Sequence, residues 1–537
     1  MNFKKFPFED QADTNEKKAE DIAKNSPGTY VFGHRFFNGQ SLYEYLIEFL
    51  LIFISSKNYT DGVYSGEMKF HDLNSRQLVY YANKNMGLKR FIFYEKSLKG
   101  KSIAADKEAY QRICDLVTEK MRQNDEDDDT VREIVGGIQD LLRGYAVAIK
   151  NRTWCATAVL PICPELIFPE AMPNVQKRLD EYQSGIKEGK HFLPKIDTEF
   201  SFDKRQFLAR GGEVYYLHLL QSLNEDPEKK QKLEQLLTYM LEDQTEPLNK
   251  TCTTIEKIWE KDLYREDETK FQEEMRQTLS LAYIPANAYT SISSFAVDEL
   301  INYLSADVDP ITRIEVLGEG VFFQIMRMMT TAVASYLNRN TLPWIIDMRG
   351  KNNNKGLRCY AAQAYESLRL SFKEALSLSE DNLLNEQREN GAGDKITEKK
   401  RIGNLKKAME NSFGIFQNKG KEIGCIVPPN GRYTRMTLSE DIVRFLVLSL
   451  VKPKTKMMLD EFLARLYKHY NIIIGPKEFH DYCSKNEEAD QQESLSGEFS
   501  SNLEQFRNFL KSVGFLLELS DATSLVVNPY DEVELSK

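Results

Sequence analysis

The residues with the clearest chemical potential in this 537-residue chain lie around Asp347. The apolar run LPWIID ends in this carboxylate and is followed by the polar stretch KNNNKG and a helix-like segment. This order predicts a buried strand, a loop and a helix, and functional side chains often lie on loops at strand ends. The first N–H groups of a helix, together with nearby cations, attract phosphate. We therefore predict Asp347 as a candidate catalytic residue and Lys351, Lys355 and Arg358 as phosphate-binding residues. The stretch lacks the GxxxxGK[ST] pattern of a P-loop.

A second group of candidates lies in the basic segment at residues 395–435. This segment holds ten lysines and arginines against three acids, a net charge of +7, and three aromatic residues lie between the cations: Phe413, Phe416 and Tyr433. Cations that pair with phosphates and rings that stack on bases are typical of a nucleic-acid groove. A lysine-rich, solvated helix is the alternative. The predicted nucleic-acid-binding residues are Lys399, Lys400, Arg401, Lys406, Lys407, Lys419, Lys421, Arg432 and Arg435.

Further cations occur at residues 84–101, next to the aromatic segments QLVYYA and RFIFYE. Aromatic and β-branched residues favour strands, so both segments are predicted to be short strands of a small α+β domain. Their aromatic side chains are explained by strand packing. The cations beside them could extend the basic surface of residues 395–435.

Histidine and cysteine patterns give little support to metal or nucleophilic chemistry. The six histidines form no HExxH pair, and the seven cysteines are scattered without a CxxC pair, whereas a structural zinc site needs four such ligands. Nucleophile-elbow, dinucleotide-binding and kinase motifs are missing as well. We expect no metal and no cofactor, and a non-catalytic role is favoured over an enzyme.

Composition and charge limit the classes of function. Hydrophobic residues make up 41% and charged residues 28%, as in ordinary globular proteins. The net charge of −10 means that the molecule as a whole does not attract nucleic acid or an anionic membrane, so such a contact needs a local patch. The run YLIEFLLIFI is too short for a membrane span, which needs about 20 apolar residues, and the N-terminus lacks the apolar region of a secretory signal. We expect a cytoplasmic protein with no membrane partner.

Apolar periodicity predicts a fold that is mainly α with small α+β parts. The length exceeds the roughly 250–300 residues at which a single core stops growing, so several domains are expected. The predicted order is a mobile arm at 1–27, an α+β domain at 28–174, a helical middle domain at 175–378, a basic connecting segment at 379–436 and a winged-helix-like domain at 437–537.

Two local patterns make sharper predictions. Ser41 and Glu44 have the spacing of a capping box before an apolar run, which predicts a helix start. Gly318 and Gly320 lie two residues apart and predict a tight turn before an apolar helix.

The C-terminal part has the element order of a winged helix. Three helices are predicted at Leu438–Val451, Lys456–Tyr470 and Asn502–Val513, followed by a wing at Phe515–Val527. Residues 439–530 hold ten basic and fourteen acidic side chains, a net charge of −4, whereas a DNA-reading domain carries a basic face. Contact with another protein is therefore favoured over contact with DNA, and a winged-helix transcriptional regulator is the alternative.

The stretches LVLSLVKPKTKMMLDEFLARLYKHYNIIIGPKEF and FRNFLKSVGFLLELSDATSLVVNPY resemble accessory proteins of bacterial antiviral defence islands, with the methylation-associated defence systems as one setting. The resemblance covers only the C-terminal part of the chain and brings no active site. It implies a non-catalytic adaptor or nucleic-acid-proximal subunit whose partners are other protein subunits of a defence system, with DNA as a second partner class. An enzyme acting on a phosphate-bearing substrate around Asp347 is the competing hypothesis.

Overall fold

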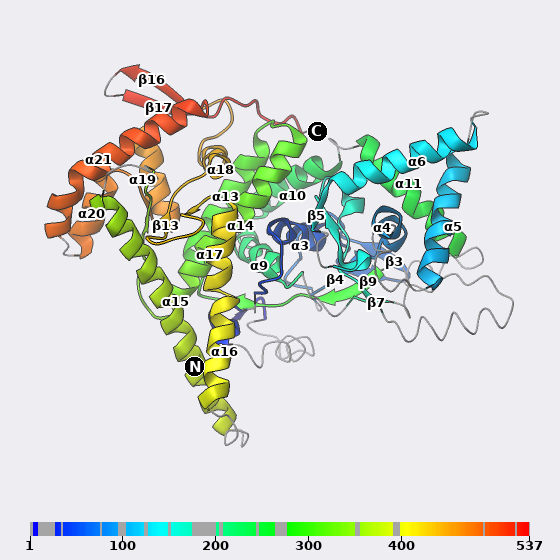
Figure 1. Cartoon of the computed structure of the whole chain (residues 1–537), viewed down its shortest axis with the longest axis horizontal. Coiled ribbons are helices and arrows are strands. Elements are labelled where there is room, and N and C mark those ends of the chain that lie inside the picture. Colours follow the sequence, from blue (N-terminus) through cyan, green and yellow to red (C-terminus); the bar gives the residue numbers. More distant parts are fainter. Residues whose placement is uncertain are drawn as a thin grey trace. The chain divides into compact units, whose positions relative to one another are not determined.

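The chain folds mainly into helices, which hold 62% of the residues against 13% in strands. This confirms the predicted mainly α class with small sheets (Figure 1). None of the described helices is long and apolar enough to span a membrane. The computed structural model describes residues 4–8, 27–33, 36–75, 78–94, 104–122, 127–148, 152–173, 200–202, 208–242, 246–263, 276–348, 355–389, 398–486, 489–520 and 523–535.

Two compact units divide the chain, and both are discontinuous in sequence. The first unit comprises residues 1–38, 213–236 and 282–537, and the second unit comprises residues 39–212 and 237–281. The observed division differs from the predicted one, because the middle segment 175–378 is shared between both units and residues 379–537 belong to one. Proline and charge spacing report only local chain character, whereas the units are formed by segments that are distant in sequence.

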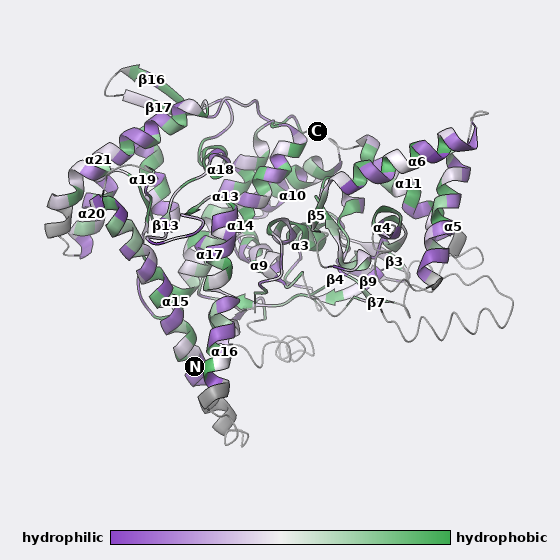
Figure 2. Ribbon diagram, viewed as in Figure 1, coloured by the Kyte–Doolittle hydropathy of each residue, from purple (hydrophilic) through white to green (hydrophobic). Residues whose placement is uncertain are grey.

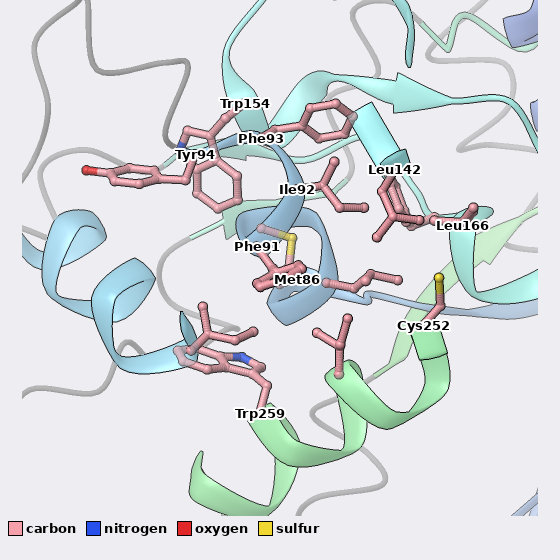
Figure 3. Packing of buried hydrophobic residues seen from close by; sticks show 14 of the residues in the cluster. Met86, Phe91, Ile92, Phe93, Tyr94, Leu142, Trp154, Leu166, Cys252 and Trp259 are labelled. Carbon is pink, nitrogen blue, oxygen red and sulfur yellow. The ribbon is translucent and has the colours of Figure 1, made fainter. Parts of the chain in front are cut away.

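The core of the second unit surrounds α4 (Met86–Phe93), which α11 (Glu246–Leu263) packs against. Figure 3 shows Met86, Phe91 and Trp259 in this core, all of them fully buried. The segment RFIFYE was predicted to be a strand, and that prediction is wrong because it lies mostly in α4. A helix buried on all sides carries a continuous apolar and aromatic run, which has the composition of a strand.

The N-terminus of α4 is capped by a carboxylate from a distant helix. Glu256 on α11 accepts hydrogen bonds from the backbone N–H groups of Gly87 at 3.3 Å and Leu88 at 2.5 Å. An acid at this end of a helix satisfies N–H groups that have no partner within the helix. The cap therefore fixes α11 on α4.

Glu260 lies one turn after Glu256 and makes the stability of the second unit depend on pH. Burial, together with the nearby Glu256 carboxylate, raises the pKa of Glu260 to about 8 from the ordinary 4.5. Between these two values the folded chain binds more protons than the unfolded chain, so stability falls as pH rises through this window. Glu260→Gln is expected to stabilise the protein at about pH 8 by roughly 1 kcal/mol or more and to have little effect at about pH 4.

Thermal denaturation at the two pH values measures this effect. Glu133→Gln is the matched control, since Glu133 is exposed on α6 (Asp128–Gly144) of the same unit and its replacement should leave the melting temperature unchanged. An unaltered pH dependence of melting in Glu260→Gln would show that Glu260 is ionised in the folded protein.

The second unit also contains α3 (Leu42–Ile54), whose start was predicted from the sequence, and several small sheets. Ser41 N donates to Glu44 Oε2 at 2.5 Å at the start of α3, as the capping-box pattern predicts. Two further helices that the structure describes in this unit are α5 (Ala104–Met121) and α6 (Asp128–Gly144). The antiparallel strand pairs are β2 (Asn58–Thr60) with β3 (Val63–Ser65), β4 (Val79–Asn83) with β9 (Arg276–Ser280), β5 (Ala146–Ala148) with β6 (Ala158–Val159), and β7 (Met172–Pro173) with β8 (Phe200–Ser201).

The first unit is built around α14 (Pro310–Tyr336), against which α18 (Glu440–Leu450) packs, and α13 (Thr290–Ser305) packs against α18. Asp309 caps α14 by accepting from Thr312 N at 3.0 Å. The predicted tight turn at Gly318 and Gly320 is wrong, because both residues lie inside α14. A Cβ atom at Gly320 would lie 2.2 Å from the Phe445 ring, so this glycine allows α18 to approach α14 closely.

The N-terminal residues contribute a strand to the first unit. β1 (Lys5–Phe6) pairs antiparallel with β10 (Ile284–Pro285), and Phe8 is buried. The predicted mobile arm at 1–27 is therefore wrong for residues 4–8, whose aromatic side chains supply an apolar anchor. Residues 9–26 lie outside the described residues. Pro27 begins α2 (Pro27–Phe32).

A three-stranded antiparallel sheet lies in the C-terminal part, in the order β14-β17-β16. The strands are β14 (Lys456–Met458), β16 (Leu516–Ser520) and β17 (Thr523–Val527). Helices α19 (Leu459–Tyr470), α20 (Pro476–Asn486) and α21 (Ala489–Ser512) precede the hairpin of β16 and β17. The predicted helix at 456–470 begins only at Leu459, because residues 456–458 alternate exposed and buried as a strand.

Candidate functional site

Asp347 follows the buried strand that its sequence predicts. β11 (Trp344–Ile345) pairs in parallel with β15 (Ile472–Ile473), and Ile346 forms a bridge to Met436. The Asp347 carboxylate is only 2% exposed and accepts from Arg435 Nε at 2.6 Å, and Arg435 is 4% exposed. The structure therefore joins the candidate catalytic residue to one of the predicted nucleic-acid-binding residues in a buried ion pair. This geometry leaves neither group facing solvent.

Asn502 on α21 forms hydrogen bonds with the backbone of the residues on both sides of Asp347. Its amide nitrogen donates to the carbonyl oxygens of Ile346 at 2.8 Å and Ile474 at 3.0 Å, and its Oδ1 accepts from Met348 N at 2.9 Å. Asn502 is fully buried. A lone asparagine in a helix gives no sequence signal for such a role, so it was missed.

The predicted phosphate-binding residues lie at the start of α15 (Lys355–Glu389). Lys355 and Arg358 belong to its first turn, whereas Lys351 lies outside the described residues. Leu357 N donates to Glu498 Oε2 of α21 at 2.5 Å. A helix N-terminus favours negative charge, and here the protein itself supplies a carboxylate where a phosphate was expected.

The basic segment consists of two helices and a hairpin. α16 (Glu398–Glu410) runs beside α15, as Figure 1 shows, and α17 (Phe413–Glu422) follows it. The hairpin joins β12 (Ile426–Val427) to β13 (Arg435–Met436). Phe413 and Phe416 are buried. The ring centroid of Phe413 lies 5.3 Å from that of Phe372, and the ring centroid of Phe416 lies 6.1 Å from that of Trp344. They belong to the core and are not placed to stack on bases.

The cations of the basic segment differ in how they are compensated. Arg401 pairs with Asp381, and Lys419 Nζ lies 2.6 Å from Glu422. Lys399 and Lys400 lie in α16, and their side chains fall outside the described part of the structure. The cations that form no ion pair with any residue the structure describes are Lys406, Lys407, Lys421 and Arg432.

The cations at residues 84–101 do not extend this basic surface where the structure describes them. Lys84, Lys89 and Arg90 are each 1% exposed. Lys89 Nζ donates to the Pro169 carbonyl at 3.0 Å, and burial lowers the pKa of Lys89 to about 8. Arg90 lies between the rings of Trp154 and Trp259. These cations are core groups of the second unit.

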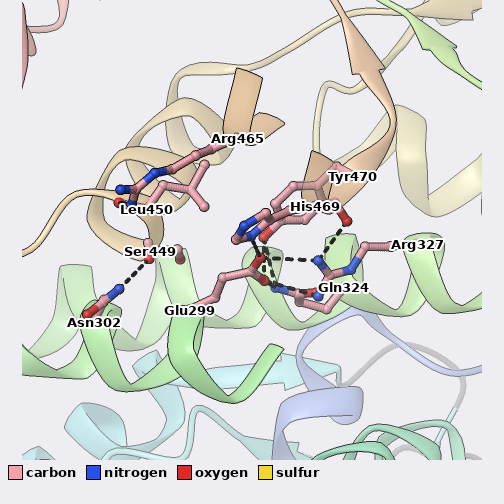
Figure 4. A network of polar contacts seen from close by, with 9 residues as sticks. All are labelled: Glu299, Asn302, Gln324, Arg327, Ser449, Leu450, Arg465, His469 and Tyr470. Atoms are coloured by element: carbon pink, nitrogen blue, oxygen red, sulfur yellow. Dashed lines mark hydrogen bonds and ion pairs between the residues drawn. The ribbon is translucent and has the colours of Figure 1, made fainter. Parts of the chain in front are cut away.

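A buried polar network that sequence reasoning missed joins α19 to α13 and α14 (Figure 4). The Glu299 carboxylate accepts from Arg327 Nη2 at 3.0 Å, Tyr470 Oη at 2.8 Å and Gln324 Nε2 at 2.7 Å. The His469 ring lies 2.7 Å from the same carboxylate. Burial alone would raise the pKa of Glu299, but the Arg327 charge and the hydrogen bonds with His469 and Gln324 outweigh it and hold that pKa below its ordinary value.

The outer face of the three-stranded sheet is apolar and exposed. Glu518 and Ser524 contact cations of α21, so they mark the inner face. The register places Met458 opposite Leu525 and Leu525 opposite Leu517, in one row across the other face. Figure 2 colours β16 as hydrophobic. The residues of this outer sheet face are Lys456, Met458, Leu517, Leu519, Leu525 and Val527.

No protein-family model, curated protein or solved structure matches the chain. Evidence on its function therefore comes from its own residues.

Among the described residues, no three histidine, cysteine, aspartate or glutamate side chains lie together in a way that could hold a metal ion. A cavity of about 80 Å³ lies between α14 and α15 and is lined mainly by apolar side chains such as Leu337, Leu368 and Phe372.

Proposed function

We propose that this chain is a non-catalytic adaptor subunit of a bacterial antiviral defence complex, and that residues 437–537 are a winged-helix-like domain that binds another subunit. The element order is α18, β14, α19, β15, α20, α21, β16, β17. Helices followed by a β16–β17 hairpin, with β14 completing the sheet in the order β14-β17-β16, support this domain type. The observation that carries the proposal is the outer sheet face. Met458 is 46%, Leu517 41% and Leu519 60% exposed on it, and contiguous apolar surface marks interaction sites.

The charges of α21 favour a protein partner over DNA. A helix that reads DNA needs cations free to contact phosphates. Arg507 Nη1 lies 3.1 Å from Glu504, and Lys511 Nζ lies 2.6 Å from Glu518. These are the two cations in the sequence of α21, so the helix presents no uncompensated positive charge. This supports the adaptor over the transcriptional regulator.

The partner that fits the outer sheet face is an amphipathic segment of another subunit, with an apolar stripe flanked by acids. Lys456 and Met458 are two positions apart on β14. They lie on the same face of the sheet because alternate residues of a strand point to the same side. It is exposed and forms no ion pair with the residues the structure describes. An apolar centre with a charged rim is typical of interfaces between subunits.

The double variant Leu517→Gln, Leu519→Gln is expected to weaken binding of the partner subunit about 10-fold or more, because it places amides in the apolar centre of the interface. Each subunit encoded beside this gene is co-expressed with the full chain, and the affinity of a co-purifying subunit is then measured by calorimetry. Leu370→Gln, Ile402→Gln is the matched control, since these side chains on α15 and α16 are 49% and 60% exposed.

A second variant tests the charge of the partner. Lys456→Glu should weaken binding of an acidic segment and make the affinity less sensitive to salt. Equal affinity of the wild type and both outer-face variants would overturn the adaptor proposal for this face. The proposal would also be overturned if the control variant in α15 and α16 lost as much affinity as the outer-face variants.

A further inference from the structure

The tip of the β12–β13 hairpin, residues 428–434, presents an exposed aromatic ring. Tyr433 is 58% exposed, whereas Phe413 and Phe416 of the same basic segment are buried. Its backbone has a φ of 61°, in the left-handed region that a tyrosine rarely adopts. Such a conformation persists only when its surroundings enforce it, and it is often found at functional positions.

The buried ion pair of Arg435 and Asp347 holds the Tyr433 backbone in this conformation. Arg435 donates from Nε to Asp347 Oδ2 at 2.6 Å and from Nη1 to the Tyr433 carbonyl at 3.2 Å. One guanidinium therefore connects the carbonyl of the exposed residue to a carboxylate that is 2% exposed. The position of the Tyr433 backbone is fixed before any ligand arrives, which lowers the ordering cost of binding.

Cations lie on the hairpin tip and on the helix that precedes the hairpin. Arg432 is exposed next to Tyr433, and Lys421 lies in the last turn of α17, shortly before β12. Neither forms an ion pair with the residues that the structure describes. The sequence from residue 423 to residue 438 contains no aspartate or glutamate. The hairpin itself therefore carries no carboxylate that would repel an anionic ligand, and Glu422, next to Lys421, is paired with Lys419.

We propose that this hairpin tip binds single-stranded nucleic acid, with the Tyr433 ring stacked on a base and Arg432 and Lys421 paired with phosphates. A stacking ring needs a base whose face is open, which a single strand offers and a duplex does not. The site shares no residue with the outer sheet face, so it stands independently of the adaptor proposal.

Binding of the full chain to a fluorescein-labelled 20-nucleotide single strand of mixed sequence, as DNA and as RNA, tests this proposal. Fluorescence anisotropy at about 50 and 200 mM salt gives the affinity and its salt dependence. Tyr433→Ala should weaken binding about 10-fold or more, because a stack on an aromatic ring contributes that much to affinity. Tyr433→Phe keeps the ring and should bind like the wild type. Arg432→Gln should weaken binding and reduce the slope of log affinity against log salt by about 0.7.

Arg132→Gln is the matched control, since Arg132 is a 72% exposed arginine of α6 in the second unit and should leave affinity unchanged. Melting temperatures near wild type are expected for all these variants, because the replaced side chains are exposed. Absence of measurable binding by the wild type at about 50 mM salt overturns the proposal. So does binding that is equal in the wild type and Tyr433→Ala, or that is tighter for the matching duplex.

Discussion

Replacing Arg327 with leucine is expected to lower the free energy of unfolding by about 3–5 kcal/mol, because it leaves the Glu299 carboxylate buried without its strongest partner. Arg327 and Glu299 are 2% and 1% exposed, so water cannot take the place of the guanidinium. The network joins α19 to α13 and α14. Chemical denaturation of the wild type and the variant measures the difference, with the slope against denaturant checked for two-state behaviour.

Arg339→Leu is the control for this change. Arg339 Nη2 lies 2.6 Å from Glu374, but the two side chains are 57% and 49% exposed, and such surface pairs contribute little to stability because water and salt screen them. Removing both charges with Glu299→Leu and Arg327→Leu should cost less than Arg327→Leu alone, since no charge then stays buried. Equal effects of Arg327→Leu and Arg339→Leu would show that the network does not hold these helices together.

Asp347→Asn is expected to cost about 2–4 kcal/mol of stability, because the Arg435 guanidinium loses its buried counter-charge. A melting temperature lower by several degrees follows. Asp381→Asn is the control, since its partner Arg401 is 39% exposed and its loss should change stability little. An unchanged melting temperature together with loss of activity on a phosphate-bearing substrate would instead support the enzyme hypothesis.

The sequence predicted the local order around Asp347 well. The buried strand that precedes Asp347 and the helix that follows it are both present, because an apolar run followed by a polar stretch indicates where a buried element ends. The partner of Asp347 was not predictable in this way. Arg435 was assigned to a nucleic-acid surface from the charge of its neighbours, whereas the fold places it in the core, 88 residues further along the chain.

Similar limits explain the other differences. Glu299 and Arg327 lie in the mostly apolar segments VDELINYL and QIMRMM, and a charged residue within an apolar helix is the only local sign of a buried pair. Gly320 looked like a turn residue because its neighbour in space, Phe445, belongs to a helix more than a hundred residues later. Periodicity shows which side of an element is covered but not which distant segment covers it.

The interleaving of the two units in the sequence sets the order in which the protein can form during translation. All residues of the second unit have been synthesised once residue 281 is complete, whereas the first unit still lacks residues 282–537. At about 5–20 residues per second, roughly 10–50 s separate these two moments. Lys5 and Phe6 are synthesised before the second unit, yet their partners Ile284 and Pro285 come only after that unit is complete. Strand β1 therefore has no partner strand until all residues of the second unit have been synthesised.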